Sequence, residues 1–214
     1  MYQPPHHRED RLEVQHALIR AHSLGTLVTL GASGLVANAI PFILDAAGGA
    51  LGTLKGHLAR SNSQWRDFDR AVEALVVFQG ADSYITPSWY QTKQETGKVV
   101  PTWNYAIVQA SGPMRTIEDR DWLAAQIAAL TATQEHARPQ PWSVSDAPAA
   151  FVESQIKGIV GIEIPIARIE GKWKVSQNRP AADRRGVVEG LLGSDDAMSQ
   201  AMATLVRERG GDER

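Results

Sequence analysis

The segment from Leu51 to Trp65 concentrates side chains that could hold an anion. It joins an apolar strand pattern to a polar turn and presents four side chains together: Lys55, His57, Arg60 and Asn62. We expect a helix to begin near Ser61, where free backbone N–H groups and the helix dipole favour negative charge. The guanidinium of Arg60 can bind a phosphate through two hydrogen bonds. The pattern predicts an anionic ligand, and an ordinary strand followed by a capped helix is the alternative.

Other kinds of site have little support in the sequence. His57 could hydrogen-bond to a flat ring or donate a proton near neutral pH. No second histidine or carboxylate stands at ligand spacing from it, so we expect no metal site. The chain has no cysteine and no Gly-x-Ser-x-Gly motif. We therefore predict no catalytic residue, and any redox chemistry would belong to a cofactor.

Two later segments combine aromatic rings with hydrogen-bond donors. In Val99–Tyr105, a strand would place Trp103 and Tyr105 on one face and Asn104 on the other. The segment Lys172–Arg179 ends a strand in donors and positive charge. It would suit a second wall for an anionic ligand or a contact between subunits.

The composition is that of an ordinary folded protein. The 214 residues are 43% hydrophobic and 21% charged, and we expect one main domain. A net charge of -2 gives no general attraction to nucleic acid, although four arginines lie among acidic residues near the C-terminus: Arg184, Arg185, Arg207 and Arg209. No apolar run approaches the roughly 20 residues that span a bilayer, and no secretory segment is evident. We expect a cytoplasmic protein without a membrane partner.

Hydrophobic periodicity predicts a β-rich chain with flanking helices. Strands are expected at Leu24–Leu30, Leu35–Leu44, Ala50–His57, Ala74–Phe78, Thr102–Ile117, Ile159–Ile169 and Trp173–Ser176, with a further short one in Ser83–Tyr90. Helices are expected at Arg8–His22, Ser63–Asp69, Glu118–His136 and twice within Asp183–Arg207, with a loop at 137–148. Pro41 predicts a bulge or a sheet edge in its strand. Successive strands with short turns favour an antiparallel barrel or sandwich.

Several motifs resemble one known family when they are taken together and in order. They are Met1-Tyr2-x-Pro4, Gly34–Phe42, Gly52–Trp65, Tyr84–Tyr90, Val100–Tyr105, Ile159–Glu163 and Trp173–Asn178. On these residues the chain resembles the PaiB-type FMN-binding negative transcriptional regulators, members of the FMN-binding split-barrel group. The matching stretches run almost from end to end of the chain.

The resemblance implies an α+β, mainly β fold, a six-stranded antiparallel split barrel. Residues 1–178 would form the barrel domain with an N-terminal helix and an inserted helix at 118–136. Residues 179–214 would form a helical segment packed on the barrel or on a dimer partner. The family usually forms homodimers with FMN at the subunit interface.

The resemblance also implies which residues bind FMN. The phosphate and ribitol would lie on Lys55, Gly56, His57, Arg60, Ser61 and Asn62. The isoalloxazine ring would lie along Asn38, Ala39, Ile40 and Pro41. The site would be closed by Ser176, Gln177 and Asn178. The chain departs from the family pattern at Asn38, where a histidine is usual; the amide keeps hydrogen bonding but has no ionisable ring.

The implied function is FMN-dependent lowering of transcription, through direct DNA contact or through another factor. The sequence itself shows no helix-turn-helix pattern and no basic stripe. Two alternatives stay open: a flavin-dependent oxidoreductase of the same split-barrel group, and a haem-binding split barrel with His57 as an axial ligand.

Overall fold

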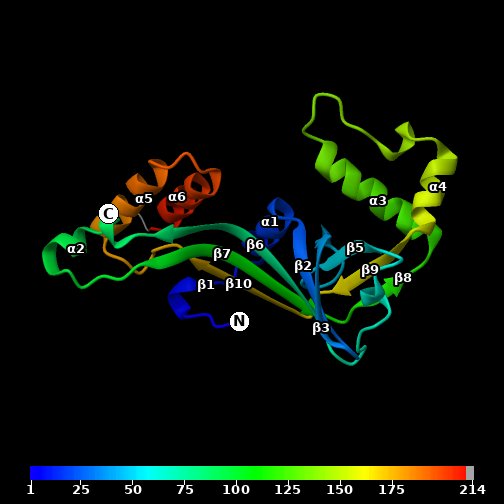
Figure 1. Ribbon diagram of the computed structural model, residues 1–214, viewed down its shortest axis with the longest axis horizontal. Helices are drawn as coiled ribbons and strands as arrows, with labels where there is room; N and C mark the ends of the chain where they lie inside the picture. The colour runs from blue at the N-terminus through cyan, green and yellow to red at the C-terminus, as the bar shows by residue number, and fades with distance from the viewer. Residues whose placement is uncertain (211–214) are drawn as a thin grey trace. The chain divides into compact units, whose positions relative to one another are not determined.

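The computed structural model describes residues 1–210, which fall into two compact units (Figure 1). The motif unit comprises His16–Phe78 and Gln109–Ile169 and contains the polar segment described above. The terminal unit comprises Met1–Gln15, Gln79–Val108 and the described part of Glu170–Arg214. Neither unit is continuous in sequence, because two long strands, β6 (Ala74–Ile85) and β7 (Thr102–Gly112), pass from one unit to the other. Residues 211–214 of the predicted C-terminal segment lie outside the described residues.

Antiparallel strands form the framework of the motif unit. Its elements are most of α1 (Leu12–Ala21), β2 (Leu24–Gly31), β3 (Gly34–Pro41), β4 (Ile43–Asp45), β5 (Thr53–Ala59), η2 (Ser63–Trp65), β8 (Arg115–Ile117), α3 (Arg120–Glu135), η4 (Val144–Asp146), α4 (Ala149–Lys157) and β9 (Ile159–Pro165). One sheet has the order β4-β5-β9-β8, and β2 pairs with β3 on one side and with β6 on the other. Alternate strand residues face an apolar core that includes Leu27, Ile40, Phe42, Leu54, Leu58, Ile162 and Ile164.

The terminal unit packs helices on strands. Its elements are η1 (Pro5–His7), β1 (Arg8–Glu9), η3 (Pro87–Trp89), α2 (Gln91–Thr96), β10 (Arg168–Lys174), α5 (Ala181–Leu192) and α6 (Ala197–Arg209), with strands in the order β1-β10-β7-β6. Gly186 and Gly190 let α5 lie directly on Trp89, because a Cβ at either position would overlap that residue. Neighbouring α5 and α6 side chains are fully buried: Val187, Leu191, Met202 and Val206.

Most predicted elements are confirmed, but several differ in extent or type. The predicted strand Leu35–Leu44 is divided into β3 and β4, and the predicted strand Trp173–Ser176 is the end of β10, which stops at Lys174. The predicted helix Ser63–Asp69 is only the three-residue turn η2, and the predicted helix Arg8–His22 begins at Leu12 because β1 pairs with β10. The predicted strand Thr102–Ile117 is interrupted at Pro113, which cannot donate to a sheet. The strands expected in Ala74–Phe78 and Ser83–Tyr90 are one strand, β6, and neither α2 nor α4 was predicted. Pro41 ends β3, which lies at the edge of its sheet as expected.

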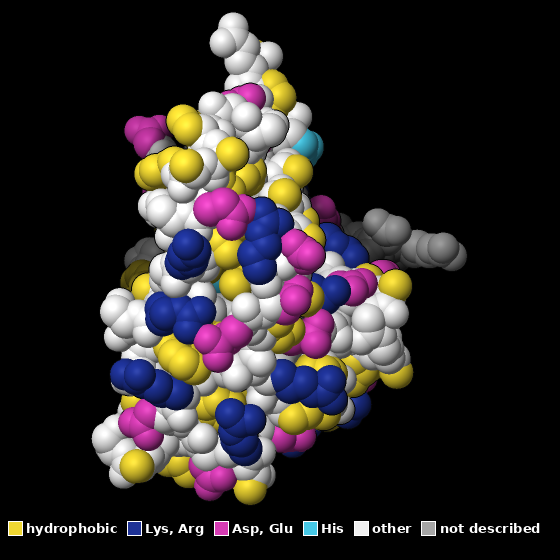
Figure 2. Space-filling view, turned by 90° about the vertical axis from the view of Figure 1, so that its right-hand side faces the viewer, with side chains coloured by type: hydrophobic (Ala, Val, Ile, Leu, Met, Phe, Trp, Pro, Cys, Tyr) yellow, Lys and Arg dark blue, Asp and Glu magenta, His cyan; other side chains and the backbone are white. Residues whose placement is uncertain are grey.

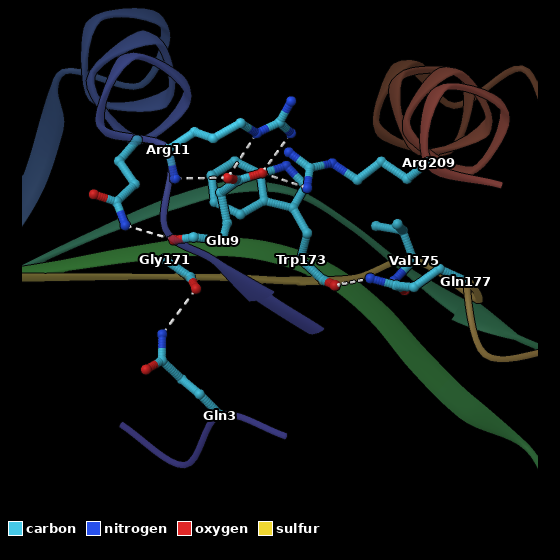
Figure 3. Close-up of polar contacts among 9 residues, drawn as sticks. Gln3, Glu9, Arg11, Gly171, Trp173, Val175, Gln177 and Arg209 are labelled. Atoms are coloured by element: carbon cyan, nitrogen blue, oxygen red, sulfur yellow. Dashed lines mark hydrogen bonds and ion pairs between the residues drawn. The ribbon is translucent and has the colours of Figure 1, made fainter. Parts of the chain in front are cut away.

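A buried carboxylate ties the first residues of the terminal unit to its last helix (Figure 3). Glu9 accepts hydrogen bonds from the backbone and guanidinium of Arg11 and pairs with Arg209 at 2.6 Å. The Arg209 guanidinium also lies 4.7 Å from the ring centroid of Trp173. Burial acts to raise the pKa of Glu9, but the hydrogen bonds from Arg11 and Arg209 outweigh it and lower that pKa to about 2.

We predict that replacing Glu9 by Gln destabilises the protein at pH 7 but not near pH 2. A carboxyl group with a lowered folded-state pKa stabilises the fold above its unfolded pKa, and the benefit disappears as pH falls from about 4.5 to about 2. The expected loss at pH 7 is on the order of 3 kcal/mol. Urea unfolding at both pH values measures it, with exposed Glu95→Gln as the control. An equal loss at both pH values would contradict this role.

Candidate functional site

Strand β5 presents two of the predicted site residues on one face. Lys55 and His57 are half-buried on that face, whereas the side chains of Leu54 and Leu58 point into the core and Gly56 is buried between them. A Cβ at Gly56 would come within 3.1 Å of the Phe42 ring and of the Pro41 carbonyl. Gly56 therefore serves close packing inside the unit, while the neighbouring cation and imidazole face outward.

Both cations of the predicted cradle are already paired with carboxylates. The Lys55 ammonium donates to Asp45 at 2.8 Å, and this hydrogen bond lowers the pKa of Asp45. Arg60 donates to the Glu118 carboxylate at 2.6 Å and to the carbonyl oxygens of Lys157 and Ile159. A phosphate at Arg60 would therefore have to displace Glu118, whose side chain is well exposed.

The turn after β5 does not provide the helix N-terminus that the sequence predicted. The 3-10 turn η2 has three residues, too few for a substantial dipole. The Asn62 side chain caps it by accepting from the Gln64 backbone N–H at 3.0 Å. Ser61 is exposed. The helix start expected near Ser61 is thus wrong, and the binding of an anion by these residues stays a prediction.

His57 is held by a buried amide from helix α3. Its Nδ1 lies 2.8 Å from Oε1 of Gln126, and the Nε2 of Gln126 is buried without a hydrogen-bond partner. Rotating the amide by half a turn would let it donate to an unprotonated Nδ1 instead. Helix α3 reaches this face because Gly161 of β9 has no side chain to obstruct Trp122. The arrangement fixes the imidazole plane.

Asn38 belongs to a hydrogen-bonded group centred on Gln64. The Asn38 amide donates to Oε1 of Gln64 at 2.8 Å. The Gln64 amide in turn donates to the carbonyls of Leu27 and Val36 and to Thr29 Oγ1. Gln64 is 1% exposed, so its side chain joins η2 to β2 and β3. Gln64 lies within the motif Gly52–Trp65, but its role depends on tertiary contacts that no sequence pattern reveals.

The other face of β2 and β3 is apolar and open. Leu24, Leu30 and Leu35 are 64%, 39% and 77% exposed. Ala37 and Ala39 lie between them on β3, opposite Val28 and Thr26 of β2, and both alanines are exposed. Of the predicted ring-contacting residues, Ala39 faces outward, whereas Ile40 is buried. The small side chains give this part of the sheet a flat apolar surface.

The three remaining predicted residues lie in the terminal unit. Ser176 adopts a positive φ of 63° and exchanges hydrogen bonds with buried Asn104, with Asn104 Nδ2 2.9 Å from Ser176 Oγ. Gln177 accepts from the Val175 N–H and donates to the Trp173 carbonyl. Asn178 is exposed. Ser176 and Gln177 thus shape the end of β10, and Asn178 is open to solvent.

A cavity of about 860 Å³ lies in the motif unit between α3 and α4. Its lining is mostly apolar, including Ala128, Ala132, Trp142, Val144 and Val152, and contains none of the predicted site residues. Among residues 1–210, no cluster of three or more His, Asp or Glu side chains could hold a metal ion. No helix in the described chain is long and apolar enough to cross a membrane.

The fold is that of a split barrel, and the comparisons with known proteins identify its family. Residues 1–168 match the family described as "Putative FMN-binding domain", and the chain belongs to this family. It is 39% identical to an uncharacterized protein of Emericella nidulans and 31% identical to the protease synthase and sporulation protein PAI 2 of Bacillus subtilis, with 98% of both chains covered in each case. The FAD and heme binding protein of Mycobacterium smegmatis is 17% identical with a TM-score of 0.55, covering 78% of this chain and 73% of that one.

The cofactor is FMN, and the motif unit fits its ring better than its phosphate. The flat surface at Ala37 and Ala39 can receive an aromatic ring, with the Asn38 backbone between them. The imidazole of His57 is held in a fixed orientation. In contrast, Lys55 and Arg60 have carboxylate partners already. The positions given to individual residues around FMN stay predictions.

We predict that Gln64→Ala destabilises the motif unit by about 1–3 kcal/mol, because it leaves the Asn38 amide and the β2 and β3 acceptors without a partner. Urea unfolding measures the loss, and the matched control is Gln155→Ala at an exposed position of α4. Equal stability of the two variants would show that the Gln64 contacts contribute nothing.

Proposed function

We propose that the protein is a homodimeric, FMN-binding negative regulator of transcription. The observation that carries this proposal is the similarity to the Bacillus protein PAI 2, which extends over 98% of both chains. The name of that relative refers to protease synthesis and sporulation, processes that a regulator would control. Similarity limited to the FMN-binding region would have supported the cofactor but not the shared role.

Bound FMN would supply reversible electron transfer, and the protein would supply binding and orientation. In this proposal Ala39 and the β3 backbone from Asn38 to Pro41 lie along the ring, and His57 hydrogen-bonds near it. Gln64 and Gln126 act as positioning residues. Gln64 accepts a hydrogen bond of 2.8 Å from the Asn38 amide, and Gln126 forms one of 2.8 Å with the His57 imidazole. The proposal gives the described site residues the roles of binding and orienting the flavin, and no proton transfer.

The open apolar face of β2 and β3 supports the homodimer. Large exposed apolar patches on folded proteins commonly mark interaction sites. Here Leu24, Leu30 and Leu35 surround small alanines on adjacent antiparallel strands, so the patch is continuous. A second copy of the chain would cover the leucines, and a flavin ring at the alanines would then be shielded from water.

The face shown in Figure 2 offers no broad basic surface for DNA. On the face shown in Figure 2, Lys and Arg side chains alternate with Asp and Glu side chains and form no basic stripe. Among the C-terminal arginines, Arg209 is committed to Glu9, and Arg184 donates to the Arg179 carbonyl. We therefore propose that regulation acts through a local contact or through another factor.

We predict that the wild-type protein sediments as a dimer and that Leu35→Asp converts it to a monomer, because a carboxylate on the apolar face would be desolvated on association. Sedimentation equilibrium with and without FMN measures the mass. Leu192→Asp, at an exposed leucine of α5, is the control and should stay dimeric. A monomeric wild-type protein would contradict the dimer.

The regulatory role predicts that deleting the gene raises a defined set of transcripts in the host. Wild-type protein supplied in trans should lower them again, and Leu35→Asp should not. RNA sequencing measures the effect, and a gel shift at low and physiological salt separates direct from indirect contact with DNA. Unchanged transcripts, together with steady turnover of a nicotinamide cofactor by the purified protein, would favour the oxidoreductase alternative.

A further inference from the structure

A small cavity in the terminal unit is lined entirely by polar and charged residues. Its volume is about 60 Å³, enough for a group of a few heavy atoms. The lining residues are Thr102, Asn104, Lys174, Ser176, Asn178 and Arg179. They come from the start of β7 and from the turn that follows β10, so both walls belong to one unit.

Two cations face this cavity without a carboxylate partner. Lys174 donates to Thr102 Oγ1 and, at 2.7 Å, to the Trp103 carbonyl. Arg179 lies over the Tyr90 ring at 4.6 Å. Within residues 1–210 neither forms an ion pair, and the nearby carboxylate of Asp183 is occupied by the backbone and hydroxyl of Thr92. This differs from the motif unit, where Lys55 and Arg60 are both neutralised.

The electrostatic situation of Lys174 is unfavourable as it stands. Burial lowers the pKa of Lys174, and the positive charges of Lys172 and Arg179 lower it further. Three cations that repel one another in a partly buried site would gain from an anion placed among them. The uncharged walls add two amide groups and two hydroxyl groups.

The backbone around the cavity is held in an uncommon conformation. Ser176 is the one residue other than glycine with positive φ in the described chain. Its hydroxyl is fixed by Asn104, which is 1% exposed. Such conformations cost energy and concentrate at binding sites, where the surrounding structure maintains them. Here the strained turn brings Asn178 and Arg179 to the cavity.

We propose that this pocket binds a single oxyanion, with Lys174 and Arg179 as its charged ligands. Both charged ligands lie beyond residues 1–168, the range that matches the family model, whereas Thr102 and Asn104 lie within it. One source of the oxyanion is the phosphate group of FMN, and this case rests on the proposed flavin site. The other source is a phosphate group of a second ligand. Both sources offer the same chemistry, and charge-assisted hydrogen bonds from a guanidinium and an ammonium suit either.

The test measures binding of inorganic phosphate, FMN and riboflavin to the full-length protein by calorimetry. Lys174→Met and Arg179→Gln should each weaken phosphate binding at least about tenfold, as expected for loss of a charge-assisted contact. Asn178→Asp places a carboxylate at the exposed rim and should weaken it similarly without disturbing the core. Exposed Lys98→Met is the matched control and should bind as the wild type does.

Two outcomes support the proposal and separate its sources. If the variants weaken FMN but not riboflavin, the pocket holds the flavin phosphate. If phosphate binds to flavin-loaded protein and the variants abolish it, the pocket holds a second ligand. Phosphate binding that is absent, or unchanged in Asn178→Asp and Arg179→Gln, would overturn the proposal. Failure of the flavin site is recognised separately, since riboflavin would then not bind the wild type.

Discussion

The pairing of β5 with β9 is the constraint on which the motif unit depends. Seven consecutive residue pairs, from Thr53 with Pro165 to Ala59 with Ile159, fix the polar segment against a part of the chain a hundred residues away. This register brings Arg60 to the carbonyls at the start of β9 and sets His57 opposite Gly161. Because Gly161 leaves room for Trp122, helix α3 can approach and hold the imidazole through Gln126.

The folded sheet explains why the segment looks more like a free anion site in sequence than in structure. The pairing of β4 with β5 brings Asp45 to Lys55, and Glu118, which is 58 residues from Arg60 along the chain, pairs with Arg60 in the folded structure. In the terminal unit, the turn after β10 leaves Lys174 and Arg179 without such partners. These two cations therefore lie in a segment whose sequence pattern pointed less strongly to an anion than Leu51–Trp65 did.

The strands, the antiparallel arrangement and the C-terminal helix pair could be predicted from the sequence, because alternation in β2, β5 and β9 reports directly which face is buried. The effects of tertiary contacts could not be predicted in this way. The polar run after β5 reads as a helix start, but Gln64 turns inward to bind β2 and β3, and η2 ends after three residues. Helix α4 was missed because it has only nine residues and directly follows a proline-rich loop.

The site residues divide in a similar way. Donor type and spacing could predict that Lys55, His57 and Arg60 lie near one another, and the resemblance supplied FMN. Neither could show that the cations are paired, that Gln126 holds His57, or that Ala37 and Ala39 form a flat open surface. Those facts depend on strands and helices that meet only in the folded chain.

The central claim is that FMN lies along the open face of β3. Hydrogen–deuterium exchange of the wild-type protein, with and without saturating FMN, tests it most directly, since bound ligand slows exchange of the amides that it covers. We predict slower exchange in peptides spanning Gly34–Pro41 when FMN is present. Protection confined to other segments, with β3 unchanged, would contradict the placement of the flavin.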